Sequence, residues 1–267
     1  MICALPMYPF DADSLALFWA ALRAQLREAG VAGVPAQLSA PDDLRRHWQH
    51  PELLLSQACG YPVATMLRER VTVLGALHFD VPGCSQSRYS STLVVRREHA
   101  GATLEQLRGK VAVCNERHSQ SGYHALRSAV APLAREGRFF GAVTFSGAHR
   151  QSARLVADGQ ADIAALDCVS ADLLRRQEPS VFAQLVSIGY TAPMPGLPLI
   201  TAATTSADTV ARLRQALNVC THAAHTPHLA DALRAMRITG FSALDADDYR
   251  ICADLAQRDR DSGLADW

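Results

Sequence analysis

Short apolar runs alternate along the chain with longer stretches whose apolar residues have helical spacing. The clearest helix is predicted over residues 13–29, with Gly30 in the position of a C-terminal helix glycine. Strands are predicted over 2–5, 53–56, 71–77, 91–96, 110–115, 142–146, 161–167 and 199–203. Further helices are predicted over 63–68, 123–135, 151–157, 170–177 and 208–217, with a shorter one opened by a capping box at Thr103. This alternation is typical of parallel sheets covered by helices on both faces, and it predicts an α/β fold.

Length and charge narrow the class of protein. A chain of 267 residues is long for one compact core and suits two lobes of roughly 100–150 residues each. The 26 basic and 26 acidic residues give a formal net charge of zero, so no global field attracts nucleic acid or an anionic membrane. No apolar run approaches the ~20 residues of a transmembrane helix. We therefore expect neither a nucleic-acid partner nor a membrane span.

The N-terminus and the cysteines bear on location. The first basic residue is Arg23, and residues 2–5 are predicted to form a strand, so a secretory signal is not expected. The seven cysteines are an odd and scattered set, which fits thiols in a reducing compartment better than a disulfide framework. We predict a cytoplasmic protein.

Polar side chains follow or flank several of the predicted strands. In open parallel sheets, ligands bind beyond the carboxyl ends of the strands, so such residues are expected along one edge. The candidate ligand-binding residues are Gln57, Tyr61, Tyr89, Ser91, Ser119, Ser121, His149 and Asp167.

The most specific candidate is the segment 119–122, Ser-Gln-Ser-Gly, at the start of a predicted helix. Backbone N–H groups and the positive end of the helix dipole attract an oxyanion, and the serine hydroxyls add donors. The alternative is simple N-capping by Ser119 or Ser121. His149 is either a pocket residue or an ordinary loop or capping residue. Asp167 either neutralises a cationic ligand group or caps the helix that follows it.

Two further patterns suggest chemistry that we do not expect. A thiol beside His149 would indicate nucleophilic catalysis, but a buried cysteine more often packs as a small apolar residue. His222, His225 and His228 have metal-ligand spacing, but Pro227 is expected to interrupt a helix there. We therefore predict no metal site and no cofactor.

Several segments together resemble the substrate-binding proteins of phosphonate-type ABC importers. They occur in the order LLLSQACGYP at 53–62, YSSTLVVR at 89–96, LEQLRGKVAVCN at 104–115, SQSGY at 119–123, GAHRQS at 147–152, VADGQADIAALD at 156–167 and PGLP at 195–198. The resemblance implies a periplasmic-binding-protein fold of type 2, with two α/β lobes joined by two crossover strands. Lobe one would combine residues 1–91 with 197–267, lobe two would be 92–190, and 191–196 would form the second crossover.

The same resemblance implies a ligand between the lobes. Ser119, Ser121, Ser91 and Tyr89 would hold phosphonate oxygens, and His149 and Asp167 would complete the pocket. The absence of a leader departs from the family pattern and argues against an ABC permease as partner.

Three functions remain as hypotheses. The first is a cytoplasmic protein that binds a small anionic or zwitterionic ligand carrying an oxyanion. The second is a cytosolic enzyme of cofactor biosynthesis on the same fold, with lyase or dehydratase chemistry. The third is a sensor that signals by cleft closure.

Overall fold

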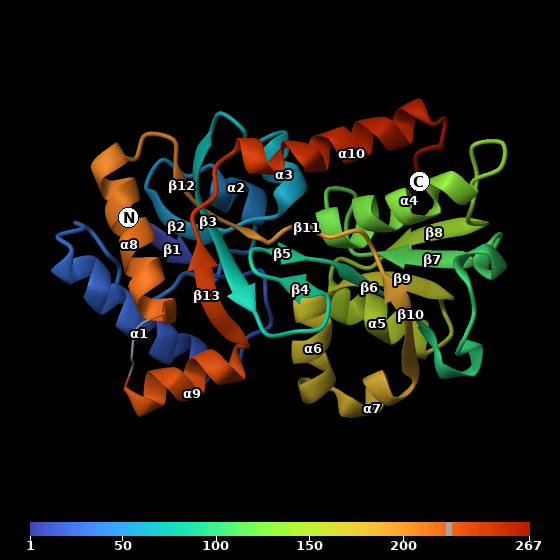
Figure 1. Ribbon diagram of the computed structural model, residues 1–267, viewed down its shortest axis with the longest axis horizontal. Helices are drawn as coiled ribbons and strands as arrows, with labels where there is room; N and C mark the ends of the chain where they lie inside the picture. Colours follow the sequence, from blue (N-terminus) through green and yellow to red (C-terminus); the bar gives the residue numbers. More distant parts are fainter. Residues whose placement is uncertain (223–225) are drawn as a thin grey trace. The chain divides into compact units, whose positions relative to one another are not determined.

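The computed structural model describes residues 1–222 and 226–267 (Figure 1). The chain forms two compact units. Unit one comprises Met1–Arg88 and Pro195–Arg250, and unit two comprises Tyr89–Met194 and Ile251–Trp267. The prediction counted residues 251–267 with the first lobe, whereas their contacts place them in unit two.

Unit one is built on a five-stranded sheet. Its strands are, in spatial order, β1 (Ile2–Ala4), β2 (Leu53–Gln57), β12 (Pro198–Ala202), β3 (Val71–Phe79) and β13 (Ile238–Ser242). Strand β1 is parallel to β2, whereas β12 runs antiparallel to β2 and β3, and β13 antiparallel to β3. Three helices pack together beside this sheet, namely α1 (Ala12–Glu28), α8 (Ala207–His222) and α9 (Pro227–Ala235) (Figure 1). The apolar stripe predicted for α1 is realised, because Phe18, Trp19, Leu22 and Leu26 are buried in the same core as strand residues such as Leu55 and Leu199.

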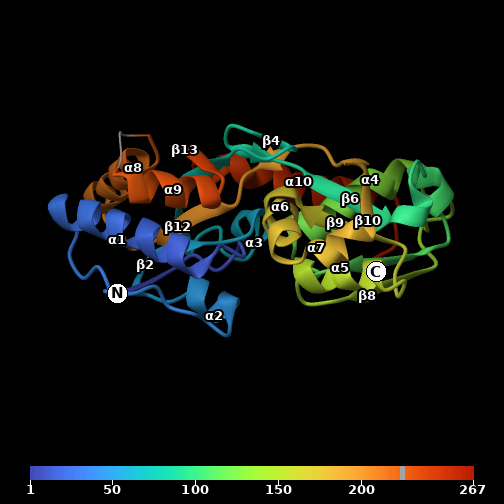
Figure 2. The same ribbon diagram turned by 90° about the horizontal axis from the view of Figure 1, so that it is seen from below.

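Unit two contains a second five-stranded sheet. Its strands are, in spatial order, β10 (Leu185–Tyr190), β6 (Ser91–Arg96), β9 (Ile163–Asp167), β7 (Val111–Cys114) and β8 (Ala142–Phe145). Strand β7 is parallel to β8 and β9, whereas β6 is antiparallel to β9 and β10. The side chains of β7 alternate between the two faces of this sheet. Val113 packs with α5 (His149–Ala157), α6 (Cys168–Gln177) and α7 (Pro179–Ala183) on one face. Ala112 and Cys114 pack with α4 (Ala125–Val130) on the other (Figure 2). Trp267 also packs against the α4 side.

The sheets are mixed, so the prediction of parallel sheets is wrong in part. Continuous apolar runs report burial on both faces of a strand, but they do not report its direction. Strand β12 also comes late in the chain, yet it lies between β2 and β3. Its direction is therefore set by a long-range connection and not by local pattern.

The helical prediction has no counterpart for α2 (Leu44–Trp48), α7, α9 or α10 (Arg250–Asp261), and it differs from the structure in three further details. The expected helix 123–135 is a π-helical turn at Gln120–His124, then α4, then a short 3₁₀ turn at Ala131–Leu133. The helix expected over 63–68 is α3, which lies earlier in the chain. Pro227 does not interrupt a helix but opens α9 at its first position, where proline is well tolerated.

The remaining bounds complete the description. The helices are α1 Ala12–Glu28, α2 Leu44–Trp48, α3 Gly60–Ala64, α4 Ala125–Val130, α5 His149–Ala157, α6 Cys168–Gln177, α7 Pro179–Ala183, α8 Ala207–His222, α9 Pro227–Ala235 and α10 Arg250–Asp261. The main strands are β1 Ile2–Ala4, β2 Leu53–Gln57, β3 Val71–Phe79, β6 Ser91–Arg96, β7 Val111–Cys114, β8 Ala142–Phe145, β9 Ile163–Asp167, β10 Leu185–Tyr190, β12 Pro198–Ala202 and β13 Ile238–Ser242. Short strands β4 Cys84–Ser85, β5 Arg88–Tyr89 and β11 Met194–Pro195 form a third sheet. Among the described residues, no helix has the length and hydropathy needed to cross a membrane.

Candidate functional site

Three neighbouring parallel strands of unit two end at the same edge of their sheet. Strand β7 ends at Cys114 and leads to the π-helical turn, β8 ends at Phe145 and leads to α5, and β9 ends at Asp167 and leads to α6. Cys114 and Phe145 are register partners, so the following segments begin side by side. Each helix start presents N–H groups without intrahelical partners, and such groups attract negatively charged or hydrogen-bond-accepting groups.

The two serines of segment 119–122 have different partners. The hydroxyl of Ser119 accepts a hydrogen bond from the N–H of Gly122 at 3.0 Å, which is the N-cap interaction. The hydroxyl of Ser121 lies 2.9 Å from Nε2 of His149 and 3.4 Å from the hydroxyl of Ser119. Both serines are buried. The capping alternative therefore describes Ser119, whereas Ser121 contacts a second predicted site residue.

Gly122 permits the close approach of the groups around it. A Cβ atom at this position would lie 1.9 Å from Oδ1 of Asn115 and 3.3 Å from Cε1 of His149. The first of these distances is far shorter than van der Waals contact. The absence of a side chain at Gly122 thus lets Asn115 and His149 pack against the turn.

The imidazole of His149 is neutral at physiological pH. Burial lowers its pKa to about 4 because the charged form is poorly solvated. Within the described part of the chain, its buried Nδ1 atom and the buried Oδ1 atom of Asn115 have no hydrogen-bond partner. Buried polar atoms without a partner are uncommon, and a bound water, ion or ligand is one explanation for them.

Ser91 and Asp167 connect β6 to this group. They are register partners on the antiparallel strands β6 and β9. The hydroxyl of Ser91 donates to the carbonyl of Ser121 at 2.8 Å, and its N–H donates to the hydroxyl of Thr191 at 2.9 Å. Ser91 therefore positions the turn that carries Ser121.

Asp167 acts as the N-cap of α6. Its Oδ1 atom accepts hydrogen bonds from the N–H groups of Val169 at 2.9 Å and Ser170 at 3.0 Å, and the side chain is buried. The sequence left two roles open for Asp167, capping of the following helix and neutralisation of a cationic ligand group. These two hydrogen bonds are those of the capping role. The carboxylate still lies opposite Ser91, at the edge that carries the other site residues.

The remaining predicted residues fall in different places. Tyr89 is buried in unit two, two positions before Ser91. Gln57 ends β2, and Tyr61 lies in α3, so both belong to unit one. The structure thus brings together Ser91, Ser119, Ser121, His149 and Asp167 within unit two.

Sequence reasoning missed Thr191 and left Asn115 out of the final set. Thr191 follows β10, a strand that was not predicted, so no local signal pointed to it. Asn115 is the last residue of the predicted strand 110–115, just as Asp167 is the last residue of the predicted strand 161–167, and in the structure it directly follows β7.

The thiols and the histidine-rich segment were the other candidates for chemistry in the sequence. Burial raises the pKa of the Cys114 thiol to about 12, so it stays protonated at neutral pH. The cysteines do not form disulfides in the described structure. His225 lies outside the described residues, and within them no group of three or more potential metal ligands gathers.

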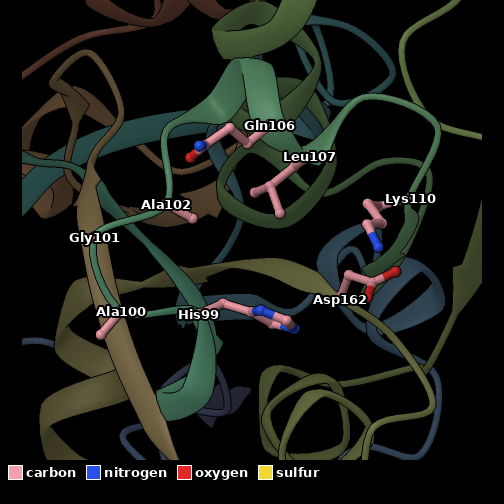
Figure 3. A pocket seen from close by; sticks show the side chains of 8 residues that line it. All are labelled: His99, Ala100, Gly101, Ala102, Gln106, Leu107, Lys110 and Asp162. Carbon is pink, nitrogen blue, oxygen red and sulfur yellow. The ribbon is translucent and has the colours of Figure 1, made fainter.

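A hollow of about 350 Å³ opens at the other edge of the same sheet (Figure 3). Lys110 and Asp162, which line it, immediately precede β7 and β9, and the carboxylate of Asp162 accepts a hydrogen bond from the N–H of Val111 at 2.8 Å. His99 and Gln106 also line the hollow. None of the predicted site residues does.

Solved structures with the same fold include several binding proteins. PhnD1 from Prochlorococcus marinus, in complex with methylphosphonate, has a TM-score of 0.75 at 14% identity and covers 96% of each chain. A binding protein component of an ABC phosphonate transporter from Pseudomonas aeruginosa has a TM-score of 0.74 at 16% identity, covering 98% of this chain and 87% of that one. A Xanthomonas citri protein bound to ATP has a TM-score of 0.69 at 20% identity and covers 98% of both chains. The chain therefore has the α/β fold of type 2 periplasmic binding proteins, as the sequence predicted.

The family follows from the sequence itself. A family model described as the periplasmic phosphonate substrate-binding protein of ABC transporters matches residues 9–249. The chain belongs to this family of small-molecule-binding proteins, which confirms the resemblance. Among proteins of curated function, none matches the sequence significantly.

The family also corrects two expectations. The prediction of a cytoplasmic protein is wrong, because the family is periplasmic. That prediction rested on the N-terminal residues and on the odd number of cysteines, whereas the family match extends over residues 9–249. The argument against an ABC permease partner rested on the same residues and has no support, since the family belongs to ABC transporters.

Proposed function

We propose that this protein binds a small ligand with a phosphonate-like oxyanion and presents it to an ABC permease. The observation that carries the proposal is the contact of Ser121 with His149 at the start of the π-helical turn. A serine hydroxyl, an imidazole nitrogen and backbone N–H groups at one helix start are neutral donors suited to oxyanion oxygens. The family, and a relative of the same fold solved with methylphosphonate, support the same class of ligand.

The charges of the predicted site residues themselves favour a ligand with little net negative charge. The group Ser91, Ser119, Ser121, His149 and Asp167 contains no arginine or lysine. His149 is neutral, because burial lowers its pKa to about 4. Asp167 adds a carboxylate. We therefore expect a monoanionic phosphonate, or a zwitterion whose amino group offsets the charge of Asp167, to bind better than a dianion.

A thermal-shift and calorimetric screen tests the proposal. The panel contains methylphosphonate, 2-aminoethylphosphonate, phosphate, methanesulfonate and acetate, together with ATP because a protein of this fold was solved with it. A ligand at one hundred times its Kd stabilises the folded state by about 2.7 kcal/mol, which gives a clear shift in Tm. Stabilisation by a phosphonate but not by acetate is expected. No stabilisation by either phosphonate would overturn the proposal, and stabilisation by ATP alone would replace it with nucleotide binding.

A matched pair of variants locates the site. Ser121→Ala removes a hydroxyl from the candidate site and is expected to weaken phosphonate binding about ten- to hundredfold, the cost of a lost hydrogen bond to a charged group. Ser180→Ala removes an exposed hydroxyl from α7 and should leave affinity unchanged. Equal affinities for Ser121→Ala and wild type would exclude this edge as the oxyanion site, even if a phosphonate binds elsewhere.

A further inference from the structure

Two imidazoles of unit one converge over a glycine. His78 lies on β3, His222 is the last residue of α8, and Gly240 on β13 is the register partner of His78. A Cβ atom built on Gly240 would lie 2.9 Å from Nδ1 of His78 and 2.8 Å from Nε2 of His222. Both nitrogens therefore lie close to the main chain of Gly240, and the ring centroids are 6.3 Å apart.

The outer nitrogen of each ring is held by a neighbouring oxygen. In His222, Nδ1 lies 3.1 Å from the hydroxyl of Thr221 and 3.2 Å from the carbonyl of Asn218. The carbonyl can only accept, so the tautomer that bonds to it carries the proton on Nδ1. The Nε2 atom that faces His78 is then the nitrogen with the lone pair. In His78, Nε2 lies 2.8 Å from the hydroxyl of Ser242, which leaves Nδ1 facing His222.

This arrangement is the one found around metal-bound histidines. A ligating imidazole usually donates its other N–H to a carbonyl, carboxylate or hydroxyl, which fixes the tautomer and the ring orientation. His222 is exposed and His78 half-buried, so an ion and its water ligands can reach the pair.

We propose that His78 and His222 form a binding site for a divalent transition-metal ion such as Zn²⁺. Imidazole nitrogens suit Zn²⁺, Cu²⁺ and Ni²⁺. Within the described residues no third ligand side chain joins them, so water completes the coordination sphere. The site differs from the one that the sequence spacing suggested, because His222 meets a histidine of the sheet rather than His228.

Gly240 is what makes the site possible. Any side chain at this position would occupy the space between the two nitrogens and push the imidazoles apart. The backbone of Gly240 has no positive φ, so alanine is tolerated by the main chain. Gly240→Ala therefore keeps both histidines and disturbs only how closely they approach.

Calorimetric titration of the tag-free protein with Zn²⁺ tests the proposal. The titrations use a Cys84→Ser background, because Cys84 is not fully buried whereas the other six cysteines are. We expect one equivalent of Zn²⁺ to bind. His222→Ala and Gly240→Ala should each weaken binding by more than about tenfold, and Ser242→Ala by roughly tenfold through the outer nitrogen of His78.

His228→Ala is the matched control, because it removes an exposed histidine from the neighbouring helix α9. It should bind Zn²⁺ as the background protein does. The proposal is overturned if millimolar Zn²⁺ gives no stoichiometric binding, if His222→Ala and Gly240→Ala bind like the background, or if only His228→Ala loses binding. His222 is exposed, so a folding defect would not obscure the result for His222→Ala.

Discussion

The hydroxyl of Ser121 and Nε2 of His149 lie 2.9 Å apart, although 28 positions separate the two residues in the chain. The contact joins the turn after β7 to the start of α5, which follows β8. Because β7 and β8 are parallel neighbours in register, both segments leave the sheet at the same edge. Strand pairing therefore determines the contact, and each residue contributes a polar group at a strand end.

Stability should fall as the pH is lowered from about 6.5 towards 4. Burial lowers the pKa of His149 to about 4 and that of His124 to about 3, whereas the ordinary value is 6.5. Between these values the unfolded chain binds more protons than the folded protein, so the free energy of unfolding rises with pH in this window. Above about pH 6.5 the two histidines are neutral in both states, and the free energy of unfolding no longer depends on them. Urea denaturation at a series of pH values measures the slope.

His149→Gln isolates the contribution of one histidine. This variant keeps a polar side chain but removes the titration, so its unfolding free energy should depend less steeply on pH than that of wild type. The expected difference is on the order of 2–3 kcal/mol across the window. Parallel curves for the two proteins would show that His149 is not buried as a neutral imidazole.

Gly122→Ala should destabilise unit two. The added Cβ would lie 1.9 Å from Oδ1 of Asn115, so the turn or the asparagine must move, and overpacking of this kind costs about 1–3 kcal/mol. Chemical denaturation of Gly122→Ala, Asn115→Ala and the double variant forms a double-mutant cycle. We expect the double variant to recover part of the loss, because Asn115→Ala removes the clashing atom. Strictly additive losses would contradict a direct clash.

Removal of residues 263–267 should destabilise the protein through Arg127. The guanidinium of Arg127 is buried and donates to the carbonyls of Leu264 at 2.7 Å and Ala265 at 2.5 Å. Truncation removes these acceptors and leaves a buried charge without them, which typically costs about 3–5 kcal/mol.

The matched control for the truncation is the same deletion in an Arg127→Leu background. There the loss should be smaller, because no buried guanidinium is left behind. It should not vanish, since Trp267 packs against Tyr123 and Phe140 in both proteins. Denaturation midpoints of the four proteins provide the comparison, and equal losses in both backgrounds would rule out the proposed role of Arg127.

Local pattern predicted most of the strands and the polar residues that follow them, because both depend on short-range sequence. Strand β10 was missed because its residues, Leu185–Tyr190, are largely half-buried or exposed and lack a continuous apolar run. The antiparallel pairing of β6 with β9 was missed because direction depends on where a distant segment returns to the sheet. For the same reason, the sequence named Ser91 and Asp167 as candidates without indicating that they are register partners.

Variants of Asp167 can separate its role as the N-cap of α6 from an electrostatic interaction with the ligand. Asn is as good an N-cap as Asp, so Asp167→Asn should leave the unfolding free energy nearly unchanged, whereas Asp167→Ala should lose roughly 1 kcal/mol with the two hydrogen bonds to α6. Both variants remove the negative charge. If Asp167 also offsets a cationic ligand group, each should bind 2-aminoethylphosphonate less tightly relative to methylphosphonate than wild type does.

Measurements of stability and of ligand selectivity separate the two roles, because Asp167→Asn keeps the N-cap and removes the negative charge. Calorimetry with both phosphonates gives the ratio of their Kd values, and denaturation of the same samples gives the stability. An unchanged ratio in Asp167→Asn, with reduced stability in Asp167→Ala, would leave capping as the sole role of the carboxylate. A changed ratio in both variants would show that the charge at the end of β9 contributes to ligand selection, since only the electrostatic term is common to them.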